Sequence, residues 1–186
     1  MRNKGIIPFS FFKSRGFALT FFLISTRQIA IMRLSKKSVY ALKALTCLGS
    51  PDAPPLIAIQ EIAQRENIPK KFLEQVLLTL NKAGIVQSNR GKAGGYSLRG
   101  APAGITLGDI VRAMDGPLSP LPCANPTAPV KCADCVSLEH CWLRAVMTEV
   151  GGAVNTALDQ ITLADICRRA AQSKRNRSMQ ALIYEI

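Results

Sequence analysis

One glycine-rich segment limits the possible folds more than any other part of this sequence. Arg90-Gly91-Lys92-Ala93-Gly94-Gly95 lies between two short apolar stretches, Ile85-Val86 and Tyr96-Ser97-Leu98. Two strands joined by such a turn predict a β-hairpin whose tip carries two cations. Glycines let that tip approach another molecule closely, because they have no Cβ atom. The alternatives are an ordinary surface hairpin and a glycine loop that binds an anion.

Three predicted helices precede the hairpin. Ser35 is an N-cap residue, and it is followed at helical spacing by Val39, Leu42, Leu45 and Leu48. Ile59, Ile62 and Ala63 mark a short second helix that ends near Asn67.

A third helix begins at Pro69, with a predicted buried stripe of Phe72, Leu73, Val76, Leu77 and Leu80. Its other face carries Lys70, Lys71, Glu74, Gln75 and Lys82. A short helix, a tight turn and a longer helix with a basic face are typical of a helix-turn-helix, and the hairpin makes it a winged one.

The charge of the chain favours a polyanionic partner. The sequence has 24 basic and 12 acidic residues, a formal net charge of +12. The first 31 residues hold five of the basic residues and no acid, so 19 basic residues against 12 acidic ones remain after them. This excess indicates nucleic acid or an anionic membrane surface.

Residues 1–31 form an apolar and aromatic leader. Lys13 and Arg15 interrupt it and leave an apolar run from Gly16 to Ser25, which is short against the roughly twenty residues of a membrane span. We interpret the leader as upstream translated sequence or a disordered segment, with Met32 as the start. A signal peptide or an anchor is the alternative, and we expect a cytoplasmic protein without a membrane partner.

A long helix with one apolar face is predicted after Cys141. Leu143, Val146, Met147, Val150, Val154, Leu158 and Ile161 recur there at intervals of mostly three and four residues. Too little chain follows to cover this face, so packing against a second copy is the expected solution. A homodimer would place two reading helices on a palindromic, double-stranded DNA operator.

Four of the six cysteines are concentrated in a predicted loop. Cys123, Cys132, Cys135 and Cys141 have the spacing C-x8-C-x2-C-x5-C within a region rich in proline and small residues. Thiolates at this spacing suit an iron–sulfur cluster or structural zinc, and a single pair suits a thiol–disulfide switch. The residue types alone do not separate these chemistries. Cys47 and Cys167 are predicted to be packed thiols, and His140 a surface residue.

The sequence resembles the Rrf family of transcription regulators, the group that contains IscR, NsrR and CymR. The resemblance runs from Met32 to about Ala170 and is carried by Met32-Arg33-Leu34-Ser35, Phe72-Leu73-Glu74-Gln75, Ser88 to Tyr96, Ile105 to Ile110 and Ile161 to Ile166. It implies a mainly α fold with a small β-hairpin wing, a winged helix-turn-helix plus a long dimerisation helix. It also implies no enzymatic activity, consistent with the lack of a phosphate loop or a nucleophile paired with a base.

The resemblance assigns roles to individual residues. Lys70, Lys71, Glu74 and Gln75 would face bases and phosphates in the major groove, Arg90 the minor groove, and Lys92 a phosphate. Cys123, Cys132, Cys135 and Cys141 would hold an iron–sulfur sensor, a two-iron form being favoured over a four-iron form, with zinc as the alternative. Relatives use three cysteines plus a histidine or an acid, but Arg144 and Val39 stand at those positions. An additional cysteine is therefore expected to supply the fourth ligand.

These features divide the chain into five parts. Residues 1–31 are the leader and 32–115 the winged helix-turn-helix domain. The cysteine-rich loop spans 116–140. A dimerisation helix and a short helix occupy 141–170, and 171–186 form a basic tail.

Overall fold

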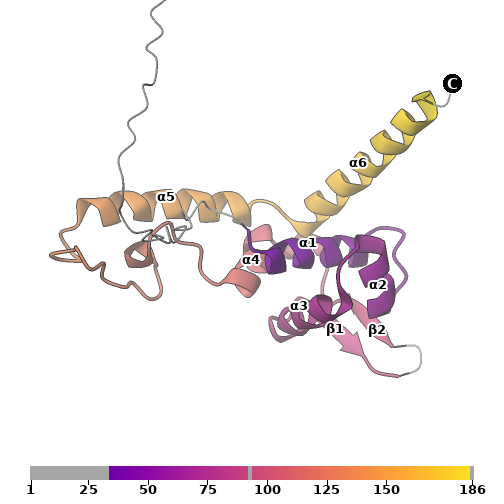
Figure 1. Cartoon of the computed structure of the whole chain (residues 1–186), viewed down its shortest axis with the longest axis horizontal. Helices are drawn as coiled ribbons and strands as arrows, with labels where there is room; N and C mark the ends of the chain where they lie inside the picture. Colours follow the sequence, from indigo (N-terminus) through magenta and orange to yellow (C-terminus); the bar gives the residue numbers. More distant parts are fainter. Residues whose placement is uncertain (1–33, 92–93, 185–186) are drawn as a thin grey trace, which may run out of the picture. The chain divides into compact units, whose positions relative to one another are not determined.

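The structure, a computed structural model, describes residues 34–91 and 94–184 (Figure 1). The predicted leader, 1–31, and the wing-tip residue Lys92 lie outside the described residues. The elements in chain order are α1 (Lys36–Leu48), α2 (Ile59–Glu66), α3 (Lys70–Lys82), β1 (Val86–Asn89), β2 (Gly95–Leu98), η1 (Pro102–Gly104), α4 (Leu107–Asp115), η2 (Pro122–Ala124), α5 (Trp142–Asp159) and α6 (Leu163–Tyr184). The predicted fold class, helices with one small hairpin, is confirmed.

Helix α1 forms the centre of the core. It begins where the Ser35 hydroxyl oxygen accepts a hydrogen bond from the Ser38 backbone N–H at 3.1 Å, as the sequence predicts for an N-cap. Its buried face is Ala41, Ala44, Leu45, Cys47 and Leu48. Val39, expected on that face, is 37% exposed. Small alanines occupy the face because α2, α3, α4 and α6 all contact this helix.

Helices α2 and α3 form the helix-turn-helix. Asn67 ends α2 in the left-handed conformation, φ 50°, which asparagine tolerates better than most residues. Leu73, Val76, Leu77 and Leu80 are the buried residues of α3. Phe72, predicted in this stripe, is 61% exposed. It precedes Leu73 by one residue, or about 100° around the helix, which directs it beside the core and not into it.

The wing is the predicted hairpin. Strands β1 and β2 are antiparallel, with Val86 opposite Leu98 and Asn89 opposite Gly95. Ile57 extends the sheet by a bridge to Tyr96, with N–H to carbonyl distances of 3.0 and 2.9 Å. Gly91 at the tip has φ 130°, a conformation that side chains rarely allow. The wing is thus attached to the domain through the bridge as well as through its own strands.

Two similar octapeptides join α4 and α6. Ile105–Arg112 and Ile161–Arg168 share the pattern ITLxDIxR, and each begins its helix with a threonine and an aspartate that cap one another. They pair reciprocally, the Leu107 N–H donating to the Ile161 carbonyl at 2.7 Å and the Leu163 N–H to the Ile105 carbonyl at 2.8 Å. This pairing attaches the α5–α6 connection to the winged helix.

Helix α6 differs from the expectation of a short helix followed by a tail. It runs from Leu163 through the segment 171–184 as one helix of 22 residues. Because alanine, arginine, lysine and glutamine are good helix formers, this composition supports a helix even without burial.

We predict that Gly95→Ala destabilises the fold by about 1–3 kcal/mol, because a Cβ there would lie 2.7–3.1 Å from the backbone atoms of Ile57. Urea unfolding followed by circular dichroism measures the change. Gly104→Ala is the control, since a Cβ at Gly104 meets nothing within 4 Å. Equal stability of the two variants would show that the Ile57 bridge does not restrict this position.

Candidate functional site

The start of α3 presents the polar residues that the sequence predicts. Lys70, Lys71, Glu74 and Gln75 are all exposed. The buried leucines behind them hold the helix against α1, α2 and α4. Lysine, glutamate and glutamine can address base edges and phosphates, so this surface has the chemistry of a reading helix. Contact with DNA stays a prediction for each residue.

A groove between α1 and α3 adds residues that sequence reasoning missed. It has a volume of about 800 Å³ and is lined by Lys36, Lys37 and Tyr40 of α1 and by Phe72, Gln75 and Thr79 of α3, among others. Lys36 and Lys37 are exposed cations in the first turn of a helix that has no acid there. Cations oppose the positive end of the helix dipole. The Asp115 carboxylate lies at the same end of α1, where it accepts hydrogen bonds from the Ser35 N–H and the Ser38 hydroxyl at 3.2 and 2.7 Å, and it offsets part of this charge.

The wing continues the same polar surface. Arg90 is exposed at its tip, and Asn81 of α3 donates a hydrogen bond to the Ser88 hydroxyl of β1 at 3.3 Å. That bond links the wing to the end of the reading helix. Lys92, predicted to contact a phosphate, lies outside the described residues, so its role stays a prediction.

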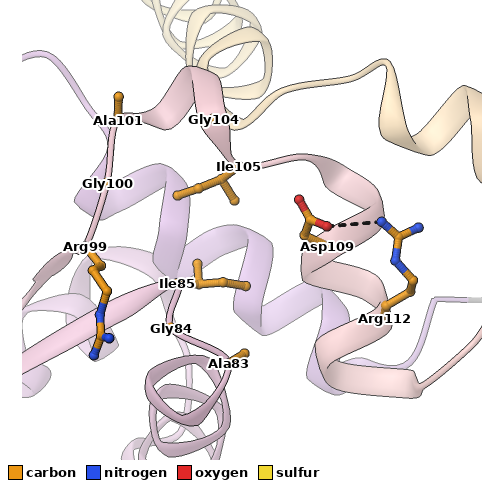
Figure 2. Close-up of a pocket in the computed structure, with 10 residues that line it drawn as sticks. All are labelled: Ala83, Gly84, Ile85, Arg99, Gly100, Ala101, Gly104, Ile105, Asp109 and Arg112. Atoms are coloured by element: carbon orange, nitrogen blue, oxygen red, sulfur yellow. Dashed lines mark hydrogen bonds and ion pairs between the residues drawn. The ribbon is translucent and has the colours of Figure 1, made fainter.

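A second pocket lies at the junction of α3, the end of β2 and α4, away from the cysteines and from the start of α3 (Figure 2). Its volume is about 510 Å³, and small residues make up much of its lining. Arg112 pairs there with Asp109 and with Asp159 of α5, at 3.1 and 2.6 Å. A side chain at Gly108 would collide with Asp159, which explains glycine where the second octapeptide has Ala164. The polar groups of Arg112 thus serve the helix junction.

The four loop cysteines differ in exposure. Cys123 is buried in η2 with 2% of its surface exposed, Cys132 is exposed, and Cys135 and Cys141 are half-buried. Cys141 is the residue at the start of α5. The buried and the exposed thiols therefore come from one continuous loop between α4 and α5.

The thiols of this loop interact with one another. The Cys123 side chain is the main cause that raises the pKa of Cys132, with further contributions from Cys135 and Cys141. Burial and the Cys141 side chain raise the pKa of Cys135. The backbone N–H of Arg144 is the main cause that lowers the pKa of Cys141. The pKa of Cys132 is thus affected by the other three thiols, and that of Cys135 by Cys141 and Cys123.

Arg144 makes hydrogen bonds to the loop, at the position where the resemblance implied a histidine ligand. Its Nε donates to the Cys123 carbonyl at 2.9 Å and its guanidinium to the Leu138 carbonyl at 3.1 Å. These bonds hold both ends of the loop against α5. Arginine cannot be a metal ligand here, but it keeps two of the cysteine-bearing segments together.

The donor set suits a thiolate-bound metal group in its chemistry. Four cysteines can supply the ligands of an iron–sulfur cluster or of zinc. Within residues 34–91 and 94–184, no three His, Cys, Asp or Glu side chains are arranged as a site for a metal ion. The fit is therefore one of residue type, with four thiols on one loop.

The other two cysteines lie outside this loop, whereas His140 lies within it, directly before Cys141. Cys47 and Cys167 are buried in the core, and burial raises the pKa of both thiols. His140 is exposed, with its Nδ1 3.4 Å from the Ser137 hydroxyl. Among the helices of the described ranges, none is both long and apolar enough to cross a membrane.

Comparison with known proteins places the whole described domain in one family. The Rrf2 family model, described as an iron-dependent transcriptional regulator, matches residues 34–169. An rrf2-like HTH-type transcriptional regulator of Rhodobacter capsulatus is 43% identical over 72% of this chain and 91% of its own length. The structure of CymR, the global cysteine regulator of B. subtilis, is similar with a TM-score of 0.58, 31% identity and coverage of 75% of this chain and 98% of that one. The structure of T. potens IscR gives a TM-score of 0.54 at 30% identity, over 76% of this chain and 90% of that one.

The winged-helix fold and these relatives agree with the resemblance seen in the sequence. Both the relatives and the fold are those of transcription regulators and not of enzymes. The chain belongs to the Rrf2 family of transcription regulators.

Proposed function

We propose that this regulator binds a palindromic operator in double-stranded DNA as a homodimer, in the cytoplasm, and responds to redox, iron or nitric oxide status through an iron–sulfur cluster on its cysteine loop. The observation that carries the proposal is the position of four cysteines on one loop between α4 and α5, from Cys123 in η2 to Cys141 at the start of α5. The family description as iron-dependent supports it.

The DNA contact has two components. The start of α3 carries Lys70, Lys71, Glu74 and Gln75, which would read bases and phosphates in the major groove. Arg90 on the wing would enter the minor groove, with Lys92 near a phosphate. Lys36 and Lys37 border the same groove as Gln75 and would add phosphate contacts.

We predict different effects for Gln75→Ala and Arg90→Gln on a duplex selected from a random-sequence library. Gln75→Ala should cost about 1–3 kcal/mol on the selected site and relax its sequence preference. Arg90→Gln should lower the log–log salt slope by about 0.9 for each phosphate that the variant no longer neutralises. Fluorescence anisotropy over a salt series measures both. Arg99→Gln is the control, because it removes the same charge at another exposed arginine. If Arg90→Gln had the same salt slope as Arg99→Gln, the role of the wing would be contradicted.

The dimer proposal depends on the free face of α5. Trp142, Val146 and Val150 recur every four residues and are 76, 44 and 44% exposed. Gly151 is the buried residue of α5 and lies against Pro120, where a Cβ would be 3.1 Å from the proline ring. This glycine therefore serves packing within the chain, and the face around Val146 is left for a second copy.

We predict that Val146→Glu separates the dimer into monomers. A carboxylate buried without a partner costs several kcal/mol and occurs twice in a twofold interface, so the dissociation constant should rise about 100-fold or more. Sedimentation velocity over a concentration series measures the change. Thr148→Glu is the matched control, because it adds the same charge at an exposed position on another side of α5. Equal dimerisation of the Val146 and Thr148 variants would contradict an interface at this face.

Cys123, Cys132, Cys135 and Cys141 would hold the cluster. When bound, it would supply a centre whose loss or change of redox state alters the ligation of the loop. Arg144 would keep the loop against α5, and the Arg112–Asp159 pair would link the far end of α5 to α4. A change in the loop would then reach the reading helices through α5 and its dimer contact. A two-iron cluster is favoured over a four-iron one.

We predict that protein purified without oxygen is coloured and contains iron and sulfide in equal amounts, and that Cys123→Ala and Cys141→Ala each remove both. Absorbance spectra with iron, sulfide and zinc assays measure this. Cys167→Ala, at a buried cysteine of the core, is the control and should retain the cluster.

Two alternatives have their own outcomes in that experiment. Colourless protein with stoichiometric zinc would replace the cluster by a structural zinc site. Metal-free protein that forms a disulfide on oxidation would indicate a thiol switch, for which Cys132 is an exposed thiol and Cys135, three residues later, a half-buried one. Neither outcome would affect the winged-helix DNA contact.

A further inference from the structure

The last helix extends beyond the residues that the Rrf2 family model matches. The Rrf2 match ends at residue 169, whereas α6 continues to Tyr184. The first half of α6 contributes to the core, since Leu163 and Cys167 are buried and the helix contacts α1 and η1. From residue 172 to 177, every residue is exposed. Core packing therefore does not explain the composition of this segment.

That composition is basic. Ile166 to Tyr184 contains no aspartate or glutamate, and its five cations are Arg168, Arg169, Lys174, Arg175 and Arg177. Arg168 forms an ion pair with Asp165, and Lys174 and Arg175 border a pocket that also has Asp52 and Glu66 in its lining. Arg169, Arg175 and Arg177 are all exposed, so a neighbouring polyanion would be attracted to them.

The arrangement of the exposed arginines favours one kind of polyanion. At 3.6 residues per turn, Arg169, Arg175 and Arg177 lie on three different sides of α6. A helix that binds a membrane surface keeps its cations on one side and its apolar residues on the other. A helix in a groove of duplex DNA meets phosphates on both walls, so cations on several sides are suited to it.

We propose that residues 169–177 of α6 form a second, sequence-independent contact with the phosphate backbone of double-stranded DNA. The proposal rests on the proposed function, because the winged helix brings the chain to DNA. Arginine suits this contact, since its planar guanidinium can donate two parallel hydrogen bonds to a phosphate. The contact adds affinity and salt dependence and leaves base selection to α3 and the wing.

The test compares two triple variants of the full chain, R169Q/R175Q/R177Q and the charge-preserving R169K/R175K/R177K. Glutamine and lysine have helix propensities close to that of arginine, so both should keep the helix. On a long duplex of mixed sequence, the glutamine variant should lower the log–log salt slope by about 0.9 for each phosphate left without a cation. The lysine variant should keep the wild-type slope. A short duplex that covers only the selected operator should bind all three proteins equally.

Several results would overturn the proposal. One is an unchanged salt slope in the glutamine variant. Another is an equal reduction of the slope in both variants together with a loss of helix by circular dichroism, which indicates a structural role. A third is binding of phosphatidylglycerol vesicles that the glutamine variant loses while duplex binding stays the same. Failure of the wild-type protein to select or bind any short operator would instead contradict the proposed function, and the two failures are thus distinguishable.

Discussion

The burial of α1 is the constraint on which the rest of the structure depends. Its face of alanines and leucines contacts α2, α3, α4, α6 and strand β2, so each of these elements is placed by packing on the same helix. Small residues at Ala41 and Ala44 let the neighbours approach closely, and fully burying a leucine such as Leu45 contributes about 1.5–3 kcal/mol. Helix α3, strand β2 of the wing and helix α6 are therefore positioned by one helix, whereas α5 contacts α4 and η2.

The wing and helix α5 are exposed, and different contacts attach each of them to the domain. The wing is attached by the Ile57–Tyr96 bridge and by the bond from Asn81 to Ser88. Helix α5 is attached at its end by Arg112 and at its start by Arg144, while its apolar face around Val146 stays exposed. Helix α5 thus connects the end of the cysteine loop to helix α4.

The cysteine loop combines a buried thiol with exposed ones. Cys123 is fixed in η2, whereas Cys132 lies at the surface, and Arg144 holds the backbone of Cys123. Arg144 therefore supports the loop by hydrogen bonds to its backbone. The chemistry of such a site is set by residue type, but its geometry depends on the bound group.

Local patterns determined much of this protein from the sequence alone. The cap at Ser35, the stripe from Leu73 to Leu80 and the glycines of the wing each encode an element within a few residues, because capping, periodicity and turn conformation are local effects. Tertiary structure decided what depends on neighbours distant in sequence. It exposed Phe72, placed Gly151 against Pro120, paired the two octapeptides and gave Arg144 its carbonyl partners. No local pattern carries these outcomes, since each requires knowing which segment packs against which. The length of α6 depends on both. Its helix-forming residues can be recognised in the sequence, but only the structure shows that the helix continues through exposed residues beyond the core.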